Sequence, residues 1–291
     1  MKCHNHINRI PAALLALILV TLACSFKPPV TQIKTGTIQG VEIQVPLPEE
    51  QTTDVKLNLG FVAGNLELSP GASGYLASGK ATFNAVDFGP KVESTGSSYT
   101  LRQGEQGIEG IPVAKEDLIN EWELQLADIP MNLNIQAGAY NGNFELGGLS
   151  LEKLSISEGG STLICAFSQP NHVEMSTFTF STGGSSLELK GLANANFAQM
   201  YFNAGAGDYT LSFDGDLQRD ANVMIDAGVG TLSLIVPEDI NTQLIFDGGL
   251  TTINTSGAWS QNDTVYTISG SGPALPITVK MGAGTLNLKT E

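Results

Sequence analysis

The sequence predicts an all-β protein, a β-solenoid-like stack of coils of about 22 residues that follows an N-terminal β-module. Apolar and polar residues alternate on both sides of a glycine-rich corner, and this unit recurs along the second half of the chain. The composition agrees, because 33 glycines and only 15% charged residues favour strands and tight turns. No long stretch rich in Ala, Glu and Lys indicates a helix.

The first residues are typical of an export signal. Lys2 and Arg9 surround a polar start, and residues 10–23 form an apolar run too short to span ~30 Å of hydrocarbon comfortably. The run ends in Leu-Ala-Cys, which resembles the lipobox of bacterial lipoproteins, although Thr21 stands where that motif usually has leucine. The resemblance implies that residues 1–23 are removed and that Cys24 is lipidated. A non-lipidated secreted protein and an uncleaved anchor are the alternatives.

Two regions are expected between the lipid and the main repeats. Residues 24–50 contain several prolines and polar side chains and are expected to form a tether. Residues 51–129 are expected to form the N-terminal β-module, which caps the solenoid because an open coil end exposes unpaired backbone groups. Within this module, residues 55–68 copy the repeat without a gap, whereas 75–86 and 98–102 predict ordinary strands.

The repeats themselves occupy residues 130–291. Their corner glycines are almost evenly spaced, with one wider gap, at positions 138, 159, 183, 205, 228, 249 and 282. Glycine at a corner allows either a positive φ or a close turn. Since side chains of a strand alternate between its faces, we expect Ile225 and Leu232 inside the stack and Asp226 and Ser233 outside.

The end of the repeat region needs protection. The last coil, 277–288, is expected to end the stack and to leave one row of backbone groups without a neighbour. The wide gap between Gly249 and Gly282 holds an insertion with Trp259 and Tyr266, which one interpretation folds back over that end. In the other interpretation, a partner or a second copy of the chain pairs there.

Charge and cysteine content exclude several functions. The formal net charge of −15 repels phosphate backbones, so nucleic acid is excluded as a partner. Cys3 lies in the export segment, Cys24 closes it, and Cys165 interrupts a strand pattern at a position expected to face the core. No pair remains for a disulfide, and no Cys/His cluster has the spacing of a zinc site.

Few residues are candidates for chemistry. His172, the only histidine after the export segment, stands in a turn-like loop and has no second histidine or cysteine for a transition-metal site. Asp214, Asp216 and Asp220 belong to the densest acidic group, and whether they bind calcium is left open, with solvated turn aspartates as the favoured interpretation. No catalytic, cofactor-binding or metal-binding residue is therefore assigned.

Two further patterns point away from known activities. The calcium-binding β-roll needs an aspartate in every repeat, but the unit after Asp208 has Thr231 at the equivalent position. Glu121 and Glu123 would face one side of a strand, as the paired carboxylates of glycan-cleaving enzymes do. No Arg or Lys accompanies them at matching positions of adjacent coils, so an enzyme is not predicted.

The repeat motifs carry a family resemblance. Residues 57–68, 205–211 and 215–220, the last followed by the corner at 225–230, resemble the toast-rack family of bacterial envelope proteins. More distantly, they are similar to the C-terminal domain of LiaF-like cell-wall stress regulators and to adhesin-like repeat domains. These motifs are structural corners, so the resemblance implies a fold more strongly than a function.

Together these observations predict a non-catalytic, lipid-anchored protein of a bacterial envelope, located outside the cytoplasm. Its rigid β-scaffold would interact with other envelope components, and its expected partners are the membrane, through Cys24, and an unidentified protein or glycan. No cofactor is expected. The alternatives are a regulator of an envelope-stress sensor kinase, by analogy with LiaF-like proteins, and a glycan-acting β-helix enzyme.

Overall fold

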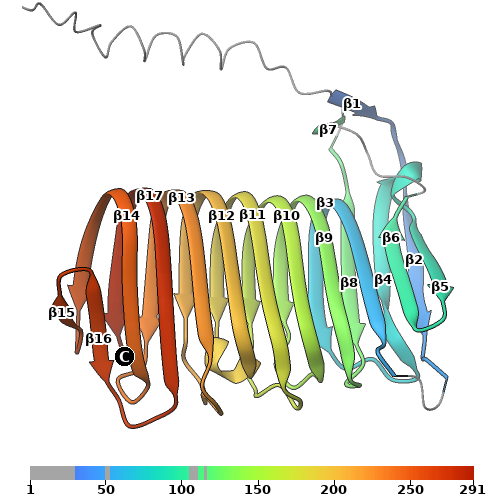
Figure 1. Cartoon of the computed structure of the whole chain (residues 1–291). Helices are drawn as coiled ribbons and strands as arrows, with labels where there is room; N and C mark the ends of the chain where they lie inside the picture. The colour runs from blue at the N-terminus through green and yellow to red at the C-terminus, as the bar shows by residue number, and fades with distance from the viewer. Residues whose placement is uncertain (1–29, 50–52, 105–110, 115–116) are drawn as a thin grey trace, which may run out of the picture.

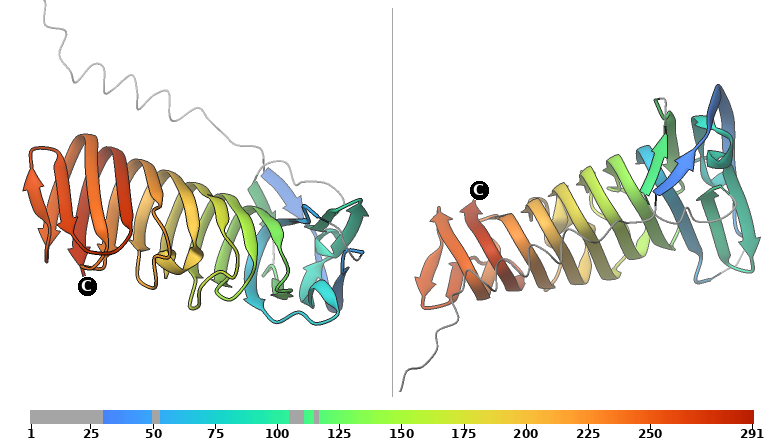
Figure 2. Two further views of the ribbon diagram at one scale, coloured as in Figure 1. Left: turned by 60° about the horizontal axis from the view of Figure 1, so that its bottom comes forward. Right: turned by 90° about the horizontal axis from the view of Figure 1, so that it is seen from above.

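The computed structural model describes residues 30–49, 53–104, 111–114 and 117–291. Within these residues the chain consists almost entirely of strands, which stack into a rod with the N-terminal module at one end (Figure 1). Figure 2 shows from above that the coils follow one another in a single row. The expected signal peptide and Cys24 lie outside the described residues.

Eight long strands of the described chain form the coils, and each pairs in parallel with the next. Each strand follows one side of the rod, bends at a corner and returns along the other side (Figure 1). In stack order they are β3 (Lys56–Pro70), β9 (Met131–Glu145), β10 (Leu151–Ala166), β11 (Met175–Lys190), β12 (Phe197–Ser212), β13 (Asn222–Val236), β17 (Ala274–Thr290) and β14 (Asn241–Ser256). The predicted β-solenoid-like fold is confirmed.

The corner glycines are needed because neighbouring coils nearly touch there. A Cβ on Gly205 would lie 2.1 Å from the carbonyl oxygen of Gly183 in the preceding coil, and a Cβ on Gly228 would lie 2.4 Å from that of Gly205. Positive φ is required at a different place, two residues after the corner, where Gly230 has φ 143°. The corner glycines are therefore required because neighbouring coils approach closely there, and not because the backbone has a positive φ.

The interior of the rod holds the ladders that the alternation predicts. Ile225 and Leu232 of β13 are buried, whereas Asp226 is exposed and Ser233 is half-buried. Ile225 pairs in register with Phe202 of β12, so apolar side chains of successive coils stack on one another. The predicted register of the repeat is confirmed.

The N-terminal module adds strands to each half of the first coil, and these strands belong to the same sheet as the coils. Two of its strands, β1 (Val30–Ile33) and β2 (Thr35–Pro46), lie within residues 24–50, where a tether was expected. Its other elements are β4 (Tyr75–Ala85), η1 (Val86–Phe88), β5 (Pro90–Thr95), β6 (Ser98–Gln103), β7 (Ile111–Ala114) and β8 (Asn120–Leu126). β6 and β5 extend the first half of β3, while β8, β4 and β2 extend its second half. β1 and β7 form a small sheet of their own. β3 itself, the ungapped copy of the repeat, pairs with β9 and is the first coil of the stack.

The other end of the rod differs from the prediction. β17 lies between β13 and β14 and pairs in parallel with both, so the expectation that the coil at 277–288 ends the stack is wrong. β14 is the outermost coil. The insertion forms β15 (Ser260–Asn262) and β16 (Val265–Ser269), and β16 pairs antiparallel with the first half of β14. The expected cover therefore exists, but it protects half of β14.

Side-chain polarity explains why β14 and not β17 is outermost. Leu286 and Leu288 of β17 are fully buried. The residues opposite them on β14 are Ile253, which is half-buried, and Thr255, which is exposed. Because burying apolar area stabilises the fold, the coil with more apolar inward side chains belongs between two neighbours.

The remaining connections are short. One contains η2 (Leu192–Ala195), a buried turn between β11 and β12. Nowhere among the described residues is there a helix long and apolar enough to cross a membrane.

Candidate functional site

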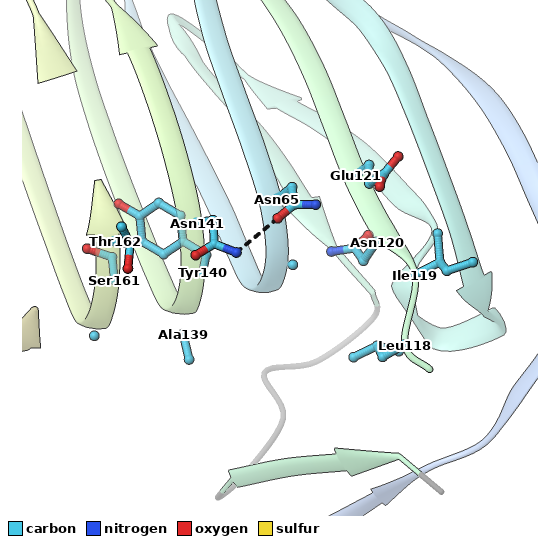
Figure 3. A pocket seen from close by; sticks show the side chains of 12 residues that line it. Asn65, Leu118, Ile119, Asn120, Glu121, Ala139, Tyr140, Asn141, Ser161 and Thr162 are labelled. Atoms are coloured by element: carbon cyan, nitrogen blue, oxygen red, sulfur yellow. Dashed lines mark hydrogen bonds between the residues drawn. The ribbon is translucent and has the colours of Figure 1, made fainter. Parts of the chain in front are cut away.

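A polar groove of about 530 Å³ lies where the N-terminal module meets the first coils (Figure 3). It is open because β6 pairs with β3 only as far as Gly60, and β8 begins to pair at Asn65. No strand of the described chain therefore covers the outer edge of the β3 corner between these two residues. The groove is lined by side chains of β3, β8, β9 and β10 and by the residues before β8.

Two buried amide side chains take the place of a strand at this corner. The backbone N–H of Val62 donates to Oε1 of Gln103 over 2.9 Å, and Nδ2 of Asn120 donates to the carbonyl oxygen of Ala63. Gln103 and Asn120 are only 4% and 2% exposed. Since a buried backbone group without a partner is costly, these amides stabilise the corner that the module leaves uncovered.

The opposite ends of the same amides remain free. Nε2 of Gln103 and Oδ1 of Asn120 are buried and have no hydrogen-bond partner in the described part of the chain. Asn120 lines the groove of Figure 3, and Gln103 lines a second groove of about 620 Å³ on the other side of the corner. A donor and an acceptor are thus left without partners next to the two grooves.

The rim of the groove presents neutral polar side chains. Nδ2 of Asn141 donates to Oδ1 of Asn65 over 3.2 Å, as the dashed line in Figure 3 shows. Thr162 pairs in register with Asn141, so it continues the same outward row onto β10. Glu121, exposed on β8, is the one carboxylate among the described lining residues. The rim therefore offers amides and hydroxyls rather than a cluster of charges.

Below the corners, a buried carboxylate anchors the first coils. Glu158 is an inward residue of β10, and its Oε2 accepts a hydrogen bond of 2.6 Å from the hydroxyl of Tyr140. Its Oε1 accepts from Ser161 over 2.6 Å and from Ser185 over 2.8 Å. Burial, followed by the charge of Glu158, raises the pKa of Tyr140 above its ordinary value, so Tyr140 stays protonated. Glu158 is not among the residues predicted from the sequence, although a glutamate at an inward position of the alternation was a visible signal.

This arrangement offers hydrogen-bond donors and acceptors to a ligand. The Tyr140 hydroxyl donates to Glu158, so it is neither ionised nor free to accept a proton. Glu121 has no second carboxylate beside it in the lining of the groove. The groove is suited to hydrogen-bonding with a neutral polar ligand.

The aspartates considered as calcium ligands hold loops in place. Oδ1 of Asp214 accepts from the backbone N–H of Gly191 over 2.8 Å, and Oδ1 of Asp220 accepts from that of Ala274 over 2.7 Å. At Asp216 it is the backbone N–H, and not the carboxylate, that makes the contact, by donating to Oδ1 of Asn194. Among the described residues, no group of three or more acidic, His or Cys side chains is placed to hold a metal ion.

The other candidates are also dispersed. Glu121 and Glu123 share the exposed face of β8, as expected, and Lys80 of β4 lies opposite Glu123, a basic neighbour that the sequence pattern did not reveal. His172 lies in a surface loop, where Nδ1 is 2.9 Å from a carboxylate oxygen of Asp128.

Cys165 behaves as predicted. It is fully buried in β10, and burial raises the pKa of its thiol, so the thiol is a core group rather than a nucleophile.

Comparison with protein families identifies the chain. Residues 34–177, which span the module, the groove and the first coils, match the family model described as the N-terminal domain of toast_rack, DUF2154. The chain contains a toast-rack N-terminal domain. The match covers β2 to the start of β11, so the toast-rack domain includes both the module and coils β3, β9 and β10. No curated protein matches this toast-rack chain by sequence.

Several solved structures resemble this toast-rack protein. A proposed cell adhesion protein from Clostridium sporogenes is 18% identical, with a TM-score of 0.48 over 88% of this chain and 100% of that one. A proposed lipid-binding protein from Parabacteroides distasonis is 12% identical, with a TM-score of 0.41 over 89% and 99%. A proposed adhesin from Bacteroides fragilis is 10% identical, with a TM-score of 0.36 over 89% and 99%. At these identities and TM-scores, the similarity says nothing further about function.

Proposed function

We propose that this protein is a non-catalytic, lipid-anchored scaffold of a bacterial envelope that binds another envelope component at the groove of Figure 3. The observation that carries the proposal is the combination of a stiff rod with a polar, weakly charged groove at the end that follows the N-terminal segment. The groove has the chemistry of a binding site and lacks paired catalytic groups in its described lining.

The stack gives the rod its stiffness. Each inner coil pairs with both neighbours along nearly its whole length, so the backbone hydrogen bonds run along the rod axis. Bending would have to stretch these bonds and separate the stacked core, where the rings of Phe180 and Phe202 lie 5.7 Å apart. A scaffold that holds a partner at a set distance needs this stiffness.

The unpaired buried atoms support a ligand at the groove. Oδ1 of Asn120 and Nε2 of Gln103 lack partners in the described chain, and such groups are uncommon in a folded protein unless something else satisfies them. A small local movement at the corner would let a polar ligand reach Asn120 from the rim formed by Asn65 and Asn141.

The position of the groove also suits a membrane anchor. β1 begins at Val30, shortly after Cys24 in sequence, and lies at the module end of the rod (Figure 1). Lipidation of Cys24 would thus place the groove at the membrane-proximal end, with β14 at the far end.

Photo-crosslinking in intact cells tests the binding site. A benzophenone amino acid at Asn141, exposed on the rim, is expected to crosslink one specific component. The matched control places the same group at Asp208, which is also exposed and stands in the same outward row three coils further along. Equal products from both positions, or none from Asn141, would reject the groove as the binding site.

Lipidation is tested separately. The mature protein is expected to lack residues 1–23 and to carry acyl mass on Cys24, as measured by intact-protein mass spectrometry. Cys24→Ala is expected to leave the membrane fraction. Retention of this variant in the membrane at the wild-type level would contradict the anchor without affecting the crosslinking result.

A further inference from the structure

The outermost coil has an open hydrogen-bonding edge. β14 pairs with β17 along its inner side from Asn241 to Ser256, but on its outer side β16 pairs only with residues 241–245. The N–H of Phe246 then donates to the carbonyl oxygen of Thr264, the last backbone contact on that side. From residue 247 to residue 256 no strand of the described chain covers the edge. Figure 1 shows the β15–β16 hairpin beside only one side of this coil.

This edge lacks the features that protect the other sheet edges. Exposed edge strands usually carry charges or proline, or are very short, which prevents them from pairing with another chain. β2 carries Glu42 and Pro46, β5 carries Pro90 and Lys91, and β15 is 3 residues long. The open half of β14 has the sequence DGGLTTINTS, which contains no proline and whose one charge, Asp247, stands at its start next to the β15–β16 hairpin.

The core is also incompletely closed beside this edge. Leu250 at the corner is 87% exposed, and Phe246 and Ile253 are only partly buried against the core. The hydroxyl of Thr251 and Nε1 of Trp259 are buried without a hydrogen-bond partner in the described chain. Backbone groups, apolar side chains and polar atoms at the tip of the rod therefore all lack a neighbour.

We propose that a second copy of this chain occupies this edge, with the open halves of two β14 strands paired antiparallel about a two-fold axis. A two-fold axis at Thr252, the centre of the open edge, places Thr252 opposite itself, and Asn254 and Ser256 opposite Leu250 and Gly248 of the second copy. A Thr–Thr pair across an antiparallel ladder is favourable, and no like charges meet.

The net charge of the chain favours contact between the tips of two rods over contact between their long faces. The chain carries a net charge of −15, so contact between the long faces of two rods would bring like charges together. End-to-end contact keeps the two charged rods apart and joins them through the uncharged stretch between Asp247 and Asp263. The N-terminal β1 remains free at the other end of each rod.

The test compares two lysine variants of the host-processed chain, purified in an excess of detergent micelles. Thr252→Lys places a charge at the centre of the edge, where it would meet its symmetry mate. Ser186→Lys is the control, because Ser186 is exposed in the same outward row but lies on β11, inside the stack and outside the lining of the groove. Analytical ultracentrifugation gives the dimer dissociation constant, and hydrogen exchange reports on the amides of residues 250–256.

We expect wild type and Ser186→Lys to dimerise with the same dissociation constant, and Thr252→Lys to dimerise at least about tenfold more weakly. Protection of the edge amides should increase with protein concentration in the first two only. Asn254→Lys, on the same exposed row, should reproduce the effect. A wild-type chain that stays monomeric while these amides exchange freely would overturn the proposal, leaving the edge to a strand of another protein. Equal dimerisation of Thr252→Lys and Ser186→Lys would overturn it too.

Discussion

Replacing Gly205 with alanine tests whether contact between coils explains the glycine repeat. The added Cβ would lie 2.1 Å from the carbonyl oxygen of Gly183 and 3.2 Å from the carbonyl carbon. Carbon–oxygen contacts normally begin at roughly 3.3 Å, so the coils must separate locally by about 1 Å. Overpacking costs ~1–3 kcal/mol, and a weakened backbone hydrogen bond adds ~1 kcal/mol. We therefore expect Gly205→Ala to lower the free energy of unfolding by about 2–4 kcal/mol.

Gly40→Ala is the matched control. Gly40 also lies in a strand, but the nearest atom to its added Cβ is the flexible Cε of Lys80 at 3.5 Å. This variant should stay within about 0.5 kcal/mol of wild type or gain slightly through the unfolded state. Equilibrium urea unfolding, followed by circular dichroism, measures both variants. If Gly205→Ala were as stable as Gly40→Ala, contact at the corner would not be the reason for the repeat.

Three further predictions concern the interior. Ile225→Ala should lower the free energy of unfolding by about 2–5 kcal/mol and Asp226→Ala by less than about 0.5 kcal/mol in the same urea assay; equal losses would contradict the register. Because burial, and then the Glu158 carboxylate, raise the pKa of Tyr140 above 10.0, the unfolded state alone loses this proton above about pH 10. Stability should fall as pH rises through that range, less steeply in Tyr140→Phe; identical pH profiles would contradict this role. Cys165 should react with a thiol reagent only at the rate of unfolding, and immediate labelling of the folded chain would contradict its burial.

The stacked coils could be predicted because their signals are local. Alternation places Ile225 inside and Asp226 outside whatever the order of the coils, and the crowding at Gly205 acts between adjacent units. The order itself is not local. The wide gap before Gly282 revealed an insertion but not that β17 passes between β13 and β14. The sequence did contain one indication of this order. β14 has the polar Thr255 where β17 has Leu288, so β14 is the coil that can stand outermost.

The groove could not be predicted, because it depends on where pairing stops. β6 and β8 leave the corner of β3 without a neighbouring strand, and the side-chain amides of Gln103 and Asn120 make hydrogen bonds to it instead. Both residues are far from this corner in the sequence, and no sequence pattern indicates the contact. Glu158 shows the opposite case. Its inward position was readable from the alternation, but its hydroxyl partners on three coils follow only from the stacking.

The position of β17 determines where the rod begins to open. In a stack of coils, stability is approximately a sum of contacts between neighbours, so opening starts at a coil with one neighbour. At the distal end that coil is β14, since β17 is paired on both sides despite holding the last residues of the described chain. The β15–β16 hairpin secures only the first half of β14, so the second half is the least protected segment of the coil. Pairing between two copies would therefore stabilise each rod at the place where it otherwise opens first.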